Sequence, residues 1–332
     1  MTIWYNLKQM KGMSTTEVTR RGFLAGAMST AATGCLFTGK SSGEFDEDLA
    51  VLLADVHVSG DEDRSGTKGN RPHLHSRDWL RKRVAGILKM RPLPRNVIIF
   101  GDLAYIVGRV IDYRQSYPEL KLLVDAGIKL TIGMGNHDHH SSFFEVWPEY
   151  EKRTLVPGQV VCTVNFPHAD LVMIDSLNET AKPGEWNPVP GGFSKAMEEW
   201  VVEYLPKWSR PFFVGAHHGF WELTYGEKKT KLRKLLCACP NFRGYIHGHD
   251  HFWNTGVVDW HVQDTRPFMT LPSSGLWGDI GYVTFRVGPD KAVANLVEED
   301  FFQPAPCAPE KRNPYWDYRI VEMQGRSCTF PI

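Results

Sequence analysis

Residues 130–138, LTIGMGNHD, pass directly from an apolar run into a glycine and three polar residues. The apolar part, 130–134, has the length and continuity of a strand that is buried on both faces. Other continuous apolar runs of the same character lie at 49–54, 96–100, 211–216 and 243–246. We therefore expect these segments to form the central strands of the fold.

Helical patterns separate the predicted strands. Two of the expected helices begin at Ser76 and Ser194, which can act as N-caps. Two further helices are expected at 118–126 and 228–236. A hairpin is expected from the strands 159–165 and 170–175. Because strands alternate with helices along the chain, the sequence indicates a layered α/β core.

Polar residues follow each of the predicted central strands. The segments are Asp55-Val56-His57, Gly101-Asp102-Leu103-Ala104-Tyr105, Gly135-Asn136-His137-Asp138, His217-His218 and Gly248-His249-Asp250-His251. Taken singly, the first, second and fourth segments are more often turns or core histidines. The third and fifth are stronger signals, because their polar residues end strongly apolar strands. Because ligands of α/β sheets gather at the carboxyl ends of strands, we expect the segments to converge on one site.

The residue types in these segments suit a metal centre. Carboxylate and amide oxygens combined with imidazole nitrogens are typical ligands of zinc, iron or manganese, and the lack of thiolates argues against a soft site. A bridging carboxylate can hold two cations about 3.5–4 Å apart, and such a pair lowers the pKa of a shared water to about 7. We therefore expect two divalent or trivalent metal ions and a metal-bridged hydroxide that attacks phosphorus.

The ordered set of segments resembles the calcineurin-like metallophosphoesterase family over roughly residues 48–255. The resemblance implies a four-layer αββα sandwich, in which helices flank two mixed β-sheets. It also implies ligand roles for Asp55, His57 and His251 at the first metal, for Asn136, His217 and His249 at the second, and for Asp102 between the two.

The same resemblance implies a catalytic role for His137, which would lie near the leaving-group oxygen and donate a proton to it. Asp138 follows directly, and we expect its carboxylate to orient the imidazole of His137 and to raise its pKa.

Two further residues have alternative interpretations. Tyr105 stands where purple acid phosphatases carry a tyrosinate ligand, to which the Gly-Asp-x-x-Tyr segment is similar, but it is also explained by packing beside the site. His218 is the alternative to His217 as the metal ligand of the paired histidines.

Substrate recognition is less well specified by the sequence. The insertion after the first strand carries Arg64, Arg71 and His73, which either bind a phosphate or lie on a solvated loop. His140 is expected beside the site as a further substrate-binding residue. Residues 176–193, rich in glycine and proline, are expected to form a rim or lid.

Composition narrows the class of substrate. The 332-residue chain has 38 basic and 38 acidic side chains and a formal net charge of zero. An electroneutral chain without a basic, aromatic-interleaved stripe disfavours nucleic acid as a partner. We therefore expect a small phosphate ester as substrate.

The N-terminal region is typical of an export signal. Residues 19–24, TRRGFL, resemble a twin-arginine motif, and a short apolar run follows it. Cys35 lies in a sequence similar to a lipoprotein cleavage box, so a lipid anchor there is an alternative. We expect a signal at 1–35, a linker at 36–47, a phosphoesterase domain at 48–298 and a C-terminal extension at 299–332, with the protein periplasmic, envelope-anchored or extracellular.

Three hypotheses for the function follow from these patterns. The first is a metal-dependent hydrolase of a phosphate mono- or diester. The second is an envelope protein that uses the same fold for binding without catalysis, and the third is a nuclease of the same superfamily.

Overall fold

The computed structural model describes residues 45–60, 76–259, 266–275, 278–302 and 324–332. All of them belong to a compact unit, residues 39–332. The predicted export signal, the anchor residue Cys35, the greater part of the linker and the loop residues Arg64, Arg71 and His73 lie outside the described residues and stay predictions. In the part of the chain that is described, no helix is both long and apolar enough to span a bilayer.

The first of two large sheets has the strand order β14-β13-β12-β1-β2-β3. Its strands are β1 (Phe45–Leu53), β2 (Leu93–Ile99), β3 (Lys129–Ile132), β12 (Gly278–Val287), β13 (Lys291–Phe302) and β14 (Ser327–Pro331). The pairs β1–β2 and β2–β3 are parallel, and the pairs that join β1, β12, β13 and β14 are antiparallel.

The second sheet has the order β10-β11-β9-β6-β5-β4. Its strands are β4 (Cys162–Asn165), β5 (Asp170–Met173), β6 (Phe212–Ala216), β9 (Phe242–His247), β10 (Asn254–Val257) and β11 (Pro267–Thr270). The central pairs, from β5 through β6 and β9 to β11, are parallel, and β4 and β10 are antiparallel at the edges. The predicted hairpin is therefore confirmed as β4–β5. A small separate sheet pairs β7 (Thr224–Tyr225) with β8 (Thr230–Lys231).

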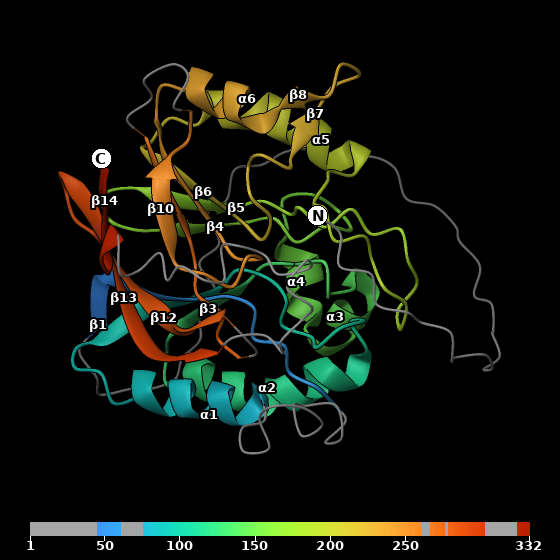
Figure 1. Ribbon diagram of the computed structural model, residues 1–332, viewed down its shortest axis with the longest axis vertical. Coiled ribbons are helices and arrows are strands. Elements are labelled where there is room, and N and C mark those ends of the chain that lie inside the picture. The colour runs from blue at the N-terminus through green and yellow to red at the C-terminus, as the bar shows by residue number, and fades with distance from the viewer. Residues whose placement is uncertain (1–44, 61–75, 260–265, 276–277, 303–323) are drawn as a thin grey trace, which may run out of the picture. The chain divides into compact units, whose positions relative to one another are not determined.

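Helices lie on the outer faces of the two sheets (Figure 1). They are α1 (Ser76–Ile87), α2 (Val110–Asp125), α3 (His140–Val146), α4 (Pro148–Arg153), α5 (Lys195–Tyr204) and α6 (Leu232–Ala238), with a 3₁₀ turn η1 (Leu205–Lys207) after α5. Figure 1 shows α1 and α2 beside the sheet that holds β1, β12 and β13, and α5 and α6 beside the sheet that holds β5 and β6. The predicted four-layer α/β sandwich is confirmed.

Three apolar layers hold this arrangement together, because neighbouring residues of a strand point to opposite faces. In β1, Ala50 and Leu52 pack between the two sheets, whereas Val51 and Leu53 pack against α1 and α2. In the second sheet the same alternation directs Phe213 to the inter-sheet core and its neighbours towards α5 and α6. The central strands are therefore buried on both faces, as their continuous apolar sequences predict.

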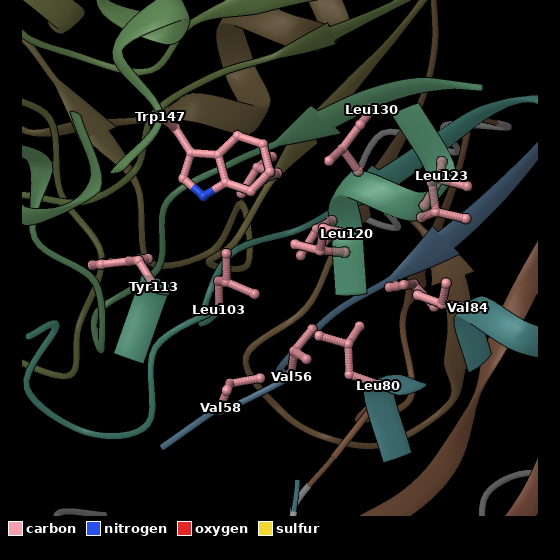
Figure 2. Close-up of a cluster of buried hydrophobic side chains, with 14 of the residues drawn as sticks. Val56, Val58, Leu80, Val84, Leu103, Tyr113, Leu120, Leu123, Leu130 and Trp147 are labelled. Carbon is pink, nitrogen blue, oxygen red and sulfur yellow. The ribbon is translucent and has the colours of Figure 1, made fainter. Parts of the chain in front are cut away.

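Figure 2 shows the layer between the first sheet and its helices. Leu80 and Val84 of α1 meet Leu120 and Leu123 of α2, and all four are at most 1% exposed. The layer continues to Val56, Val58 and Leu103, which lie in the loops that follow β1 and β2. The hydrophobic core therefore extends up to the loops that carry the predicted ligands.

The boundaries of some elements differ from those expected. The helix predicted at 118–126 begins earlier, at Val110, where the Asp112 carboxylate accepts the backbone N–H of Arg109 at 3.1 Å and no serine or threonine forms the cap. The expected domain boundary at 298 falls inside β13, and β14 pairs with β13, so the sandwich includes strands assigned to the C-terminal extension. The predicted cap at Ser194 is present, since its side chain accepts the Met197 N–H.

Candidate metal centre

Seven predicted ligands lie at the carboxyl ends of strands from both sheets. They are Asp55, His57, Asp102 and Asn136, which follow β1, β2 and β3, and His217, His249 and His251, which follow β6 and β9. Six of them are at most 3% exposed, and His249 is half-buried. The structure therefore brings the predicted segments together.

The first group of donor atoms consists of Asp55, His57 and His251. The Nε2 atom of His251 lies 3.2 Å from Asp55 Oδ1 and 3.2 Å from His57 Nε2. His57 Nε2 lies 3.8 Å from Asp102 Oδ2. Two nitrogens and oxygens of two carboxylates thus surround one point.

The second group consists of Asn136, His217 and His249. The Nε2 atom of His217 lies 3.2 Å from Asn136 Oδ1, from His249 Nδ1 and from Asp102 Oδ2. Asp102 Oδ2 therefore faces both groups, which is the position that a bridging carboxylate requires.

Backbone carbonyls fix the imidazoles that face the centre. His57 Nδ1 bonds to the carbonyl oxygen of Tyr105 at 3.0 Å, and His217 Nδ1 bonds to that of Phe100 at 2.8 Å. Each ring therefore turns its Nε2 atom towards the carboxylates. Opposed imidazole nitrogens 3.2 Å apart repel each other unless a proton or a cation lies between them. This donor set fits metal ions.

Most of the predicted ligands have a strained backbone. Positive φ values occur at Asp55 (53°), His57 (53°), Asp102 (52°), His249 (74°) and His251 (63°). Among the described non-glycine residues, only Lys229 shares this conformation. Such backbone costs about 1–3 kcal/mol per residue and tends to cluster at functional sites. The strain turns each strand end so that its side chain faces the centre.

Gly135 allows the loop after β3 to approach Asp102. A Cβ atom at Gly135 would lie 2.7 Å from the backbone nitrogen of Asp102 and closer still to its Oδ1. The close approach lets the backbone N–H of His137 donate to Asp102 Oδ1 at 2.8 Å. The glycine is therefore needed for its small size.

The charges at the centre are set by competition between burial and ion pairing. Burial disfavours the ionised forms of Asp55 and Asp102, but the neighbouring histidines outweigh it and lower the pKa of both carboxyls. Burial lowers the pKa of His57 to about 3. Although burial also disfavours the charged form of His217, Asp102 and Asp55 raise its pKa to about 10. Of these two imidazoles, His57 is therefore neutral near pH 7, whereas His217 carries a proton that the buried carboxylates stabilise.

His137 lies beside the centre, but Asp138 does not orient it. His137 Nε2 is 3.8 Å from Asp102 Oδ2, and Nδ1 bonds to the carbonyl oxygen of Ile106 at 2.9 Å. Burial lowers the pKa of His137, whereas an increase was predicted. The prediction for Asp138 is therefore wrong, because a backbone carbonyl takes the place of the carboxylate.

Asp138 instead joins the loops that follow β2 and β3. Its carboxylate accepts the N–H groups of Ala104 at 3.0 Å and Gly135 at 2.9 Å, and the hydroxyl of Tyr113 at 2.9 Å. Burial and the nearby Asp102 raise its pKa to about 6. Its role is to position the loops that hold Asp102 and Asn136.

His140 was expected to contact the substrate, and the structure corrects this. Its Nε2 bonds to Asp175 Oδ2 at 2.7 Å, and its Nδ1 bonds to Glu179. His139 Nδ1 also bonds to Glu179, at 2.8 Å. Because both ring nitrogens of His140 are bound to carboxylates and the residue is 8% exposed, it is not available to a phosphate.

The alternatives at Tyr105 and His218 stay open. The backbone carbonyl oxygen of Tyr105 bonds to His57 Nδ1. This contact involves only the backbone of Tyr105 and does not test its phenol as a metal ligand. His218 Nδ1 lies 2.8 Å from Ser176 Oγ, and its buried Nε2 has no hydrogen-bond partner. Its ring is 4.7 Å from that of His249, so it is grouped with His217 and His249 as a candidate ligand.

Two acidic residues near the centre are not indicated by the sequence. Glu179 bridges the two histidines that follow the Gly-Asn-His-Asp segment, and Glu222 Oε1 lies 4.0 Å from His249 Nε2. Neither follows a predicted strand directly. A lone acidic residue in a loop carries no local signal, so only the tertiary structure reveals them.

Comparisons with known proteins show the family of the chain. The family model described as calcineurin-like phosphoesterase matches residues 50–252, more than half of the chain. A dimetal phosphatase from Danio rerio aligns with a TM-score of 0.53 and 14% identity, over 75% of this chain and 95% of that chain. The structure of PhoD aligns with a TM-score of 0.48 and 11% identity, over 77% of this chain and 66% of that chain. No curated protein matched the sequence.

The packing of Gly135 predicts that Gly135→Ala lowers metal binding. The added methyl group would displace Asp102, so we expect at least a tenfold loss of metal affinity, measured by titration of the metal-free protein. Gly86→Ala, in α1, is the matched control, because a Cβ there meets nothing within 4 Å. Equal metal affinities of the two variants would contradict the proposed close approach.

The cluster around His140 predicts a pH-dependent contribution to stability. Burial disfavours its charged form, but Asp175 and Glu179 raise its pKa to about 10, from about 6.5 in an unfolded chain. The stabilisation is therefore fully present below pH of about 6.5 and is lost as the pH rises through about 10. We expect the difference in unfolding free energy between the wild type and His140→Gln, from urea denaturation, to shrink from pH 6 to pH 9.5. A constant difference would contradict this assignment.

Proposed function

Because the chain belongs to the calcineurin-like phosphoesterase family, we propose that it hydrolyses a small phosphate mono- or diester at a centre of two metal ions. The observation that carries the proposal is the position of Asp102 Oδ2, which faces both groups of buried donor atoms. Zinc, iron and manganese suit the mixture of oxygen and nitrogen donors. Bound cations of this kind acidify water and neutralise the charge on phosphoryl oxygens.

Each of the two cations would be held by its own group of residues. Asp55, His57 and His251 would hold the first cation, and Asn136, His217 and His249 the second, with Asp102 shared. The carbonyls that bind the Nδ1–H groups of His57 and His217 keep both Nε2 atoms available. The buried carboxylates offset part of the positive charge of the ions.

His137 is placed to act on the leaving group. Its Nδ1–H donates to Ile106, so Nε2 is the atom that carries or releases a proton near Asp102. A bound phosphoryl group is anionic and raises the pKa of a neighbouring imidazole. The protonated Nε2 can then donate to the leaving oxygen as the ester bond breaks.

Metal removal and reconstitution test the proposed reaction. We expect a chelator to abolish hydrolysis of para-nitrophenyl phosphate or of its bis ester, and zinc, iron or manganese to restore it. Asp102→Asn, which removes the shared carboxylate charge, should recover less than about 1% of the activity. Lack of turnover with every metal would favour the binding protein, and turnover of diesters alone, nucleic acids included, would favour the nuclease.

The role of His137 predicts an effect that depends on the leaving group. An alkoxide needs a proton far more than para-nitrophenolate does, so His137→Ala should lower kcat for ethyl phosphate by about 10²–10⁴-fold. We expect kcat for para-nitrophenyl phosphate to fall less than tenfold, with unchanged metal content by elemental analysis. Equal losses for both esters would contradict the proton-donor role.

A further inference from the structure

A partly exposed aromatic side chain packs against the proposed proton donor. The indole of Trp186 makes an edge-to-face contact with the His137 ring, with 4.7 Å between the ring centroids and an interplanar angle of 87°. Trp186 is 39% exposed, whereas the side chain of His137 is 16% exposed. An indole that remains this exposed has a large apolar surface available for another group.

The segment that carries Trp186 is tied to the loop of the metal centre. Glu179 accepts the backbone N–H of His140 at 3.0 Å and bonds to the ring of His139. Directly after Trp186, the side-chain amide of Asn187 donates to the carbonyl oxygen of Asp138 at 3.0 Å.

Further bonds fix the same segment close to Trp186. The Gly184 N–H donates to the carbonyl oxygen of Val107 at 3.0 Å, and the Asn187 Oδ1 atom accepts the N–H groups of Thr180 and Ala181. The position of the indole relative to His137 is therefore set by bonds on both sides of it. Such preorganisation is expected of a binding surface, because little order is lost when a ligand arrives.

A carboxylate lies beside His249, in the second group of donor atoms. Glu222 Oε1 lies 4.0 Å from His249 Nε2, and Glu222 Oε2 accepts the Gly191 N–H at 3.0 Å, which fixes the carboxylate. A ligand with additional negative charge on that side would be repelled. Next to His137, in contrast, Trp186 offers an uncharged aromatic ring.

We propose that Trp186 is a specificity-determining residue that binds a planar, uncharged aromatic leaving group of the ester. The inference rests on the proposed function, because that function places the leaving oxygen beside His137. A ring attached to this oxygen would lie within reach of the indole face, and contacts of this type favour aromatic over small alkyl groups.

The binding of unreactive analogues tests this inference without requiring turnover. Benzylphosphonate and methylphosphonate share the phosphonate but differ in the aromatic ring, and their affinities for the full-length, manganese-loaded protein can be measured by calorimetry. We expect Trp186→Ala to weaken benzylphosphonate about tenfold and methylphosphonate less than twofold. Trp186→Phe should retain most of the preference, because it keeps an aromatic face.

Trp221→Ala is the matched control. Trp221 is 38% exposed, almost the same as Trp186, but its ring contacts are to Phe220, His247 and Phe268. We expect this variant to keep the ratio of the two phosphonate affinities. In Trp186→Ala, Trp186→Phe and Trp221→Ala alike, the ratio of kcat/KM for benzyl phosphate to that for methyl phosphate should change in the same direction as the ratio of the two phosphonate affinities.

The outcomes separate this inference from the proposed reaction. An equal loss of affinity for both phosphonates in Trp186→Ala, or no loss for either, would overturn the role of Trp186. A preference for benzylphosphonate that disappears only in the Trp186 variant supports that role. If this preference is found but no ester is hydrolysed with any metal, the aromatic subsite stands and the proposed hydrolysis fails.

Discussion

The burial of the Asp102 carboxylate is the constraint on which the rest of the centre depends. An ionised carboxylate that is 1% exposed is strongly unfavourable unless positive charge and hydrogen-bond donors surround it. His217, the backbone N–H of His137 and the neighbouring imidazoles of His57 and His137 supply part of that compensation. The loops after β1, β3 and β6 must therefore all approach the end of β2. Metal ions in the two groups of donors would supply the rest.

The apolar layers hold the strained backbone of the centre in place. Residues with positive φ would relax if the strands before them could shift, but β1, β2, β6 and β9 are buried on both faces and tightly packed. Val56 lies between the strained residues Asp55 and His57, and Leu103 directly follows the strained Asp102. Both pack into the layer beneath α1 and α2. The rigid core therefore holds the loops in a conformation that they would not adopt alone.

Much of this structure could be predicted from the sequence because its signals are local. Continuous apolar runs indicated the central strands, and polar residues directly after them indicated the metal centre. The roles of Asp138 and His140 could not be predicted in this way, because each depends on partners 25 to 39 residues away, such as Tyr113 and Glu179. The start of α2 was missed because its capping pair lacks the usual residue types. The contact of Trp186 with His137 likewise exists only in the folded chain.

The division of the predicted ligands between the two sheets has a consequence for the stability of the whole fold. Asp55, Asp102 and Asn136 belong to the first sheet, and His217, His249 and His251 to the second, so a cation in either group fastens one sheet to the other. A ligand that binds only the native state stabilises it by about 2.7 kcal/mol when its free concentration is 100 times Kd. The supply of metal would thus govern the lifetime of the protein as well as its activity, because the metal-free protein unfolds and is degraded most easily.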